Sequence, residues 1–300
     1  MTKTLIHVGF ATLRMTTPLV LAALGGVFSQ QVGLLNIALE GMMLMGAFAA
    51  VVVAAAVGSS VVGVGAAALV GLLTALIFAF FVIHLRADLI VAGLAVNILA
   101  LGLTAYLLQV LFNTRGAYAP KDLEGLGSLT IPLLDQVPLL GPMLSGHKWL
   151  VYVTWLLVFL SWLVLYRTPL GIHIRAVGEH REAAETAGLP VKRIQYLALL
   201  TSGFLSGLAG AQLSLGNLTL FSENMSNGRG FMALAAVFFG QARPLPTALA
   251  CLLFGVFEAV QIRLQMTVQI PNQLPQMLPY LIIVVVLTVL SLRERRLSAR

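Results

Sequence analysis

The chain has 300 residues, of which 59% are hydrophobic and 10% are charged, and its mean hydropathy is +0.96. Soluble domains carry about 25% charged residues, so this composition excludes an ordinary soluble protein and indicates an integral membrane protein. The formal net charge of +7 comes from side chains near the ends of apolar segments. We therefore expect anionic lipid headgroups as partners and no nucleic acid.

Long apolar segments recur along the whole chain. A helix satisfies its own backbone polar groups in a hydrocarbon layer about 30 Å thick, and the alternation typical of membrane strands is absent. We predict an all-α polytopic membrane protein with about eight to ten transmembrane or half-membrane helices. The apolar segments are residues 16–34, 37–57, 60–83, 88–112, 149–166, 196–216, 229–240, 245–262 and 276–292. No soluble stretch is long enough for a core of its own, so residues 1–300 form a single transmembrane domain.

Two of these segments are incomplete as membrane spans. Residues 16–34 are interrupted by two glycines and two glutamines, and residues 229–240 are too short to cross at 1.5 Å per residue. Both are predicted to be half-helices or re-entrant segments. If every segment spans, the N-terminus lies outside; alternatively, residues 3–14 form an amphipathic piece on the inner membrane surface.

The distribution of lysine and arginine predicts the orientation, because cytoplasmic loops retain positive charge. Residues 113–148 contain few basic side chains, together with acidic residues and prolines, which is typical of an external loop. Two other regions are basic and are predicted to be cytoplasmic, as is the turn at Arg86. These regions are the loop 167–195, with Arg167, Arg175, Arg181, Lys192 and Arg193, and the C-terminal tail, with Arg293, Arg295, Arg296 and Arg300.

A short surface helix is predicted within the basic loop 167–195. Residues 179–187 favour a helix, Gly188 supplies a C-terminal stop, and Pro190 prevents continuation. The paired Ala183 and Ala184 present a small flat face to a partner's groove, flanked by the charges of Glu182 and Glu185. The alternative is an ordinary amphipathic connector at the bilayer surface.

The sequence lacks the motifs of several classes of enzyme and of a cysteine-based metal site. The sequence has no G-x-x-x-x-G-K-[ST] phosphate loop, so the chain does not hydrolyse ATP by itself, and it has neither an H-E-x-x-H helix nor a G-x-S-x-G elbow. The single cysteine, Cys251, lies in an apolar segment, which excludes disulfides and a thiolate metal site within the chain. We expect a protein that is not an enzyme, with no catalytic residues, cofactor or metal of its own.

Polar side chains inside the apolar segments are costly in lipid and therefore normally face protein or water. The alternative to lining a solute pathway is interhelical hydrogen bonding, which we favour for Asn97 and Gln109 and leave open for Glu40 and Glu258. Glu258 and Gln261 share a helix face. The candidates are Asn36, Glu40, Asn97, Gln109, Glu258 and Gln261.

Glycines suggest two further features. Gly203, Gly207 and Gly210 have the spacing of small residues at close helix contacts. The run from Asn227 to Gly230, which includes Arg229, either begins a half-helix at mid-depth, with backbone donors facing a ligand, or forms a plain external turn.

Three stretches of this sequence resemble permease subunits of ATP-binding-cassette (ABC) importers, in the branch shared by branched-chain amino acid, ribose and nucleoside systems. The stretch from Thr16 to Ala50, with N-I-A-L-E-G, resembles the N-terminal signature of that branch. Residues 171–193 resemble its coupling region with E-A-A and the later glycine, and residues 227–240 resemble its second half. The N-I-A-L-E-G and G-R-G-F-x-A-L-A-A forms look most like permeases paired with basic-membrane-protein-type lipoproteins that capture nucleosides.

The resemblance implies an importer of a small polar solute, most similar to nucleoside importers, in a bacterial inner membrane. Simple sugars, riboflavin and branched-chain amino acids are alternative solutes, and an ion-coupled secondary transporter is the alternative class. The implied partners are a separate ATPase that holds the ATP and Mg²⁺, a second permease chain, identical or different, and an external substrate-binding lipoprotein. The implied ATPase-coupling residues are Glu182, Ala183, Ala184, Glu185 and Gly188, and the pathway candidates are Asn36, Glu40, Asn97, Arg229, Glu258 and Gln261.

Overall fold

The computed structural model describes residues 2–121, 123–130, 141–267 and 288, and its architecture is helical. Seven helices in these residues are long and apolar enough to cross a membrane. They are α1 (Thr2–Gln31), α2 (Leu39–Val57), α3 (Ser60–Ala79), α4 (Leu89–Phe112), α7 (Trp149–Arg167), α10 (Val191–Ala211) and α12 (Pro244–Thr267). Short π-helical segments, Phe80–His84 and Gln212–Leu218, continue α3 and α10. The prediction of an all-α polytopic membrane protein is confirmed.

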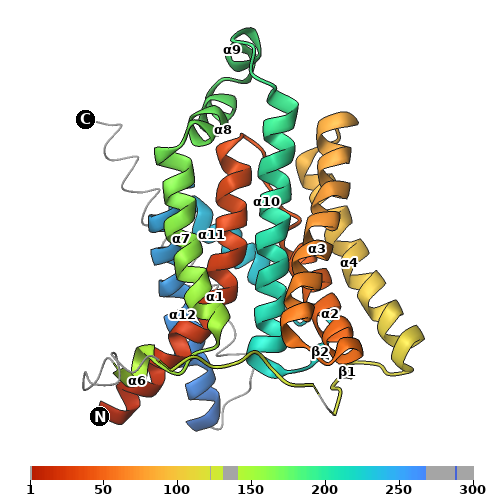
Figure 1. The fold of residues 1–300 in the computed structure, drawn as a ribbon, viewed down its shortest axis with the longest axis vertical. Coiled ribbons are helices and arrows are strands. Elements are labelled where there is room, and N and C mark those ends of the chain that lie inside the picture. The colour runs from red at the N-terminus through yellow and green to blue at the C-terminus, as the bar shows by residue number, and fades with distance from the viewer. Residues whose placement is uncertain (1, 122, 131–140, 268–287, 289–300) are drawn as a thin grey trace.

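The shorter elements lie around the ends of this bundle. They are α6 (Gly141–Leu144), α8 (Pro169–Glu179), α9 (Arg181–Thr186), α11 (Arg229–Phe239) and the paired strands β1 (Ala117–Tyr118) and β2 (Phe221–Ser222). Figure 1 shows α6, β1, β2 and the start of α1 at one end of the bundle, and α8 and α9 at the opposite end. The described parts of 113–148 therefore lie at the end opposite the loop 167–195, as the charges of the two regions predict.

The first apolar segment differs from its prediction. Helix α1 runs without a break through Pro18, Gly25 and Gly26, so neither a re-entrant segment at 16–34 nor a separate amphipathic piece at 3–14 forms. Packing explains the difference, because these glycines are contact points. A Cβ atom on Gly25 would lie 2.7 Å from the Ser202 carbonyl oxygen of α10, and one on Gly26 would lie 2.9 Å from Val237 of α11. Tertiary contacts therefore keep continuous a helix whose glycines lower its helix propensity.

The other segments follow the prediction more closely. Residues 229–240 form the short helix α11, as their length requires. Segments 2 to 6 and segment 8 coincide with α2, α3, α4, α7, α10 and α12. The ninth segment, 276–292, and the basic tail with Arg293 to Arg300 lie outside the described residues, apart from residue 288.

Helix α10 packs against α1, α2 and α3 through small residues. A side chain at Gly203 would collide with the backbone of Gly71 in α3, and one at Gly210 would collide with Met43 in α2. Gly207 lies equally close to Ala67. The predicted small-residue helix contacts are therefore confirmed. They allow the helix backbones to approach closely, which strengthens van der Waals packing in a membrane protein.

Candidate functional site

The loop between α7 and α10 folds into two short helices rather than one. Helix α8 begins with Pro169 after Thr168, whose hydroxyl accepts a hydrogen bond from the Gly171 amide (3.3 Å). It ends at Glu179; the next residue, His180, has an extended backbone (φ −150°, ψ 92°), and α9 begins at Arg181. The predicted helix over 179–187 is therefore wrong at its start. The extended conformation of His180 separates Glu179, in α8, from α9.

The end of α9 follows the prediction in detail. Gly188 has φ +82°, its amide donates to the Glu185 carbonyl (3.0 Å), and the Leu189 amide donates to the Ala184 carbonyl (3.0 Å). These two bonds form a Schellman motif, which satisfies the last carbonyl groups of the helix. Glycine is favoured at the end of α9 because a residue with a Cβ atom would adopt this left-handed conformation only at a cost in free energy. Figure 1 shows α9 at the tip of the molecule.

The two alanines of α9 face opposite ways. Ala183 is exposed, whereas Ala184 is 5% exposed and belongs to the same buried apolar cluster as Val177 and Ile194. The predicted flat face made by both alanines is therefore wrong, because Ala184 anchors α9 to the bundle. The surface that α9 presents is made by Glu182, Ala183 and Glu185.

At the centre of the bundle, Glu40 of α2 caps the N-terminus of α11. Its carboxylate accepts hydrogen bonds from the amides of Gly228 (2.8 Å) and Gly230 (2.6 Å) and is 8% exposed. The first amides of a helix have no partner within the helix, and the helix dipole favours a negative charge there. A Cβ atom on Gly230 would lie 2.5 Å from the Glu40 amide nitrogen, so the close approach requires glycine.

The predicted half-helix beginning at 227–230 is thus confirmed, but its donors contact Glu40 within the chain instead of a ligand. The residue between the two glycines makes a second polar contact. Arg229 forms a salt bridge to Glu258 of α12 (3.1 Å) and donates to the Met225 carbonyl (3.2 Å). The structure therefore brings together Glu40, Arg229 and Glu258, which come from three different helices.

This central cluster is not fully satisfied. Glu258 Oε2, Arg229 Nε and Ser226 Oγ are buried and have no hydrogen-bond partner among the described residues. Gln261, one turn further along α12, is half-buried. Unsatisfied buried polar atoms are uncommon in native structures. Two of these atoms belong to the ion pair itself, and Ser226 precedes Arg229 by three residues, so a polar solute or water at the pair would gain hydrogen bonds.

The remaining polar candidates connect helices. Asn36 is fully buried and donates to the Ser202 hydroxyl of α10 (2.8 Å). Asn97 of α4 accepts from the Gly41 amide (2.8 Å) and donates to the Ile37 carbonyl (3.0 Å). These bonds hold the first turn of α2 between α4 and α10. Gln109 is exposed on α4 and takes no part in the cluster.

The sequence did not predict the hydrogen-bond partners of these side chains. Ser202 carries no signal in the sequence beyond its place among small residues of α10, and Ser226 lies in a polar run that is typical of a turn. The N-I-A-L-E-G and N-G-R-G runs are each conspicuous, but nothing in either predicts that they contact each other across 188 residues.

At the opposite end of the bundle, His147 lies between α6 and α7. Its ring stacks on Phe10 (centroids 3.9 Å apart), and Nε2 donates to the Met143 carbonyl (2.9 Å). Burial lowers the pKa of His147 below its usual value, the Met143 carbonyl partly opposes this shift, and the nearby charge of Arg14 adds to the lowering. His147 is therefore uncharged near neutral pH.

Comparison with known proteins identifies the family of this chain. Residues 9–287 match the family described as the branched-chain amino acid transport system / permease component. The chain belongs to this family. It is therefore an ABC importer permease, a non-catalytic transport subunit, and the resemblance of its three sequence stretches is confirmed.

Relatives of this permease are named for different solutes. It is 36% identical over 266 residues to the guanosine ABC transporter permease NupQ of Bacillus subtilis, covering 84% of this chain and 81% of the relative. It is 34% identical to the nucleoside permease NupC of Lactococcus lactis (82% and 79% covered). It is also 36% identical to the putative glucose permease TsgC13 of Haloferax volcanii (85% and 77% covered). No solved structure gives a significant match.

Proposed function

We propose that this permease translocates nucleosides across a bacterial inner membrane, in an importer powered by a separate ATPase subunit. The observation that carries the solute class is the similarity over more than 80% of the chain to permeases named for guanosine and for nucleosides. The N-I-A-L-E-G run supports the same solute. Its glutamate, Glu40, occupies the N-terminus of α11.

The charges at the centre of the bundle favour a neutral solute. Glu40 is bonded to two amides, and Arg229 is paired with Glu258, so these three charged groups already have partners within the chain. An amino acid brings a carboxylate and an ammonium group, and each would require an opposite charge in the pathway. A nucleoside requires only hydrogen bonds to its hydroxyls and base edge, which Glu258 Oε2 and Ser226 Oγ are able to make.

Glucose is the second candidate, because it is also neutral and because TsgC13 is as similar to this chain as NupQ is. An uptake experiment separates the two. The permease is reconstituted into vesicles with its ATPase, partner permease and binding lipoprotein, and the entry of labelled guanosine and, separately, of labelled glucose is measured with and without ATP. We expect ATP-dependent uptake that unlabelled inosine inhibits and glucose does not. Uptake of glucose alone would favour the second candidate, and uptake driven by an ion gradient without ATPase would refute both.

We further propose that the ATPase binds at α9, on the surface formed by Glu182, Ala183 and Glu185. The basic residues of the loop 167–195 support a cytoplasmic position for this end, with the β1–β2–α6 end and the start of α1 outside. In this proposal ATP and Mg²⁺ reside on the ATPase, the binding lipoprotein contacts the external end, and a second permease chain completes the pathway. Closure of the ATPases would move α9, and Ala184 and the Gly188 turn would transmit that movement to α10.

Two tryptophan substitutions test the coupling role. Ala183→Trp adds bulk to the exposed face, so we expect a folded permease that no longer co-purifies with the ATPase. Ala184→Trp adds bulk beneath the helix, so we expect an α9 that is displaced from the bundle and ATP hydrolysis without transport. Val61→Trp, at an exposed site in the first turn of α3, outside the loop 167–195, is the control. Normal ATP-driven uptake by both α9 variants would contradict the proposal.

A further inference from the structure

An open cavity of about 620 Å³ lies at the α9 end of the bundle, where α7, α8, the end of α1 and the start of α12 meet. Its volume falls within the range of about 300–1,000 Å³ that is typical of small-molecule sites. A second cavity of about 370 Å³ adjoins it and shares Gln31, Arg175 and Gln241. The larger cavity is lined by Gln31, Trp162, Tyr166, Arg175, Gln241, Arg243, Pro244, Leu245 and Pro246.

The charge of the larger cavity is positive. Among the described residues, Arg175 and Arg243 line it without an aspartate or glutamate, and Glu179 lines only the adjoining smaller cavity. Arg175 is held in place by the Tyr166 ring (5.1 Å) and by a hydrogen bond to the Gly171 carbonyl (3.4 Å), while Arg243 is exposed. In the described part of the chain, neither arginine has a carboxylate within salt-bridge distance. Two guanidinium groups without an acidic partner are well suited to a phosphate.

The arginines, more than the helix terminus, define this site. Helix α12 begins at the cavity, but Pro244 and Pro246 have no amide hydrogen, so its first turn offers few backbone donors. Its dipole still adds a favourable potential for an anion. A third guanidinium, that of Arg167, lies over the Trp162 ring (5.5 Å) at the same corner and adds to the positive potential.

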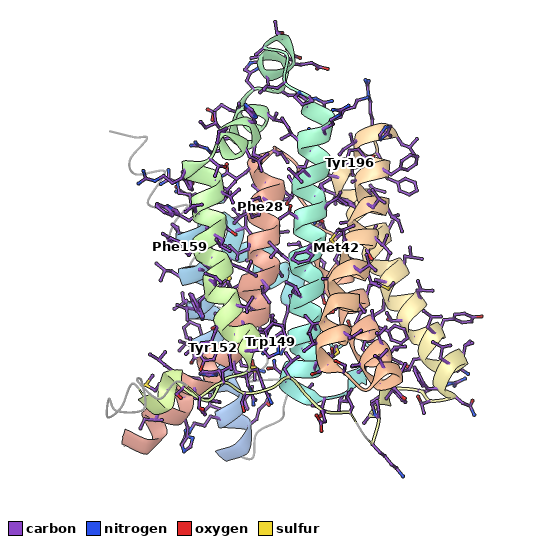
Figure 2. All side chains as sticks on the ribbon, in the orientation of Figure 1. Phe28, Met42, Trp149, Tyr152, Phe159 and Tyr196 are labelled. Carbon is purple, nitrogen blue, oxygen red and sulfur yellow. The ribbon has the colours of Figure 1, made fainter. Side chains whose placement is uncertain are left out.

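The surroundings of the cavity indicate where the anion comes from. Trp162 and Tyr166 are the aromatic types that gather at the membrane–water interface. Exposed apolar side chains continue from the cavity along α7 and α12, namely Phe159 (54% exposed), Leu245 (50%) and Leu249 (65%). Figure 2 shows Phe159 projecting away from the bundle. A phosphate that carries acyl chains fits this combination better than a free phosphate.

We propose that Arg175 and Arg243 bind the phosphate group of an anionic phospholipid in the membrane leaflet on the α9 side. The lipid connects α8, which leads into α9, with α12, which carries Glu258. It thereby holds the proposed ATPase-binding segment against the helix that contacts the central cluster. The binding of the lipid does not depend on which solute the permease carries.

Native mass spectrometry of the purified full-length chain tests this proposal, with phosphatidylglycerol titrated into detergent micelles that contain phosphatidylcholine. The double variant Arg175→Gln/Arg243→Gln removes both guanidinium groups. We expect it to lose one bound phosphatidylglycerol per chain, with roughly 30-fold weaker binding, because each guanidinium loses a hydrogen bond to the phosphate that contributes about 1 kcal/mol. The matched control is Arg86→Gln/Arg193→Gln, which removes two exposed arginines away from the cavity and should bind normally.

Two further variants separate the loss of the guanidinium charges from misfolding. Arg175→Lys/Arg243→Lys keeps the charge and should retain the lipid within a few-fold, and the single variant Arg243→Gln, at an exposed side chain, should weaken binding even if the double variant misfolds. Unchanged lipid binding in the glutamine variants, or equal loss in the control, would overturn the proposal. Displacement of the lipid by millimolar inorganic phosphate would show that a free anion is the ligand, which would also overturn it.

Discussion

The central polar cluster and the α9 end of this permease contain similar side chains, but the fold uses them differently. Glu40 and Glu258 are buried and Arg229 is half-buried, and all three are bonded to groups of the same chain, whereas Glu182 and Glu185 are exposed. A polar group in the membrane centre has no water to bond to, so it must find a partner in the protein. At the membrane surface the same groups remain hydrated and are available for a partner protein.

Substitutions in the central cluster should therefore affect folding, and substitutions on the exposed face of α9 should affect coupling. Substitutions at the centre are expected to reduce the free energy of unfolding, because they leave buried donors or charges without partners. Substitutions on the exposed face of α9 are expected to affect association with the ATPase while the bundle stays folded. We therefore expect the effects on stability to decrease from the central cluster toward the two ends.

The largest effect is expected at Glu40. Glu40→Ala leaves the amides of Gly228 and Gly230 buried without an acceptor, so we expect a loss of about 3–5 kcal/mol in the free energy of unfolding. Denaturant unfolding in detergent measures it. Glu182→Ala, on the exposed face of α9, is the matched control and should unfold like the wild type. Equal stability of the two variants would remove the distinction between the centre and the end.

The salt bridge between Arg229 and Glu258 should rank second. Removing one partner of a buried pair costs about 3–5 kcal/mol, but the Arg229 side chain is 24% exposed, so we expect about 1–3 kcal/mol for Arg229→Met or Glu258→Gln. The double variant should be more stable than the sum of the single effects predicts, because no charge remains unpaired. A double-mutant cycle measures this coupling, and strict additivity would show that the pair contributes nothing.

A substitution at Gly188 should affect both the stability of α9 and the coupling of ATP hydrolysis to transport. Gly188→Ala forces a left-handed residue with a Cβ atom, so we expect a loss of about 1 kcal/mol, local loosening of α9 and reduced ATP-driven uptake. Gly65→Ala is the control with the opposite sign: Gly65 lies in helix α3 with no atom within 4 Å of an added Cβ, so alanine should stabilise. Thermal unfolding and vesicle uptake measure the two effects. A stabilised Gly188→Ala variant would contradict the role of the Schellman turn.

The smallest effect is expected from His147 at the end opposite α9. Because its pKa is lowered in the folded protein, the unfolded chain binds a proton more readily as the pH falls. The contribution of the neutral ring to stability is present above about pH 6.5, the ordinary pKa of histidine, and is lost as the pH falls through the lower folded-state pKa. Thermal unfolding of wild type and His147→Gln between pH 7.5 and pH 5 should show a steeper loss for the wild type, by less than about 1 kcal/mol. Parallel curves would exclude His147 as the source.

Composition and spacing predicted most of the fold. The apolar segments located the helices on described residues, the length of 229–240 predicted α11, and Gly188 predicted the end of α9. These features depend on local properties of the chain, such as segment length and the conformations open to glycine, so the sequence alone was sufficient.

Contacts between residues far apart in the sequence could not be predicted and depend on how the helices pack. Helix α1 is continuous because Gly25 and Gly26 contact α10 and α11. Ala184 is buried because α9 packs against α8 and α10, and the amides beside Arg229 face Glu40 instead of a solute. Composition and local residue preferences were enough to predict a multi-pass membrane protein with a turn at Gly188. Which polar groups are bonded within the chain and which remain available depends on how helices far apart in sequence pack together, because a buried polar group is satisfied by whichever partner the packing brings within reach.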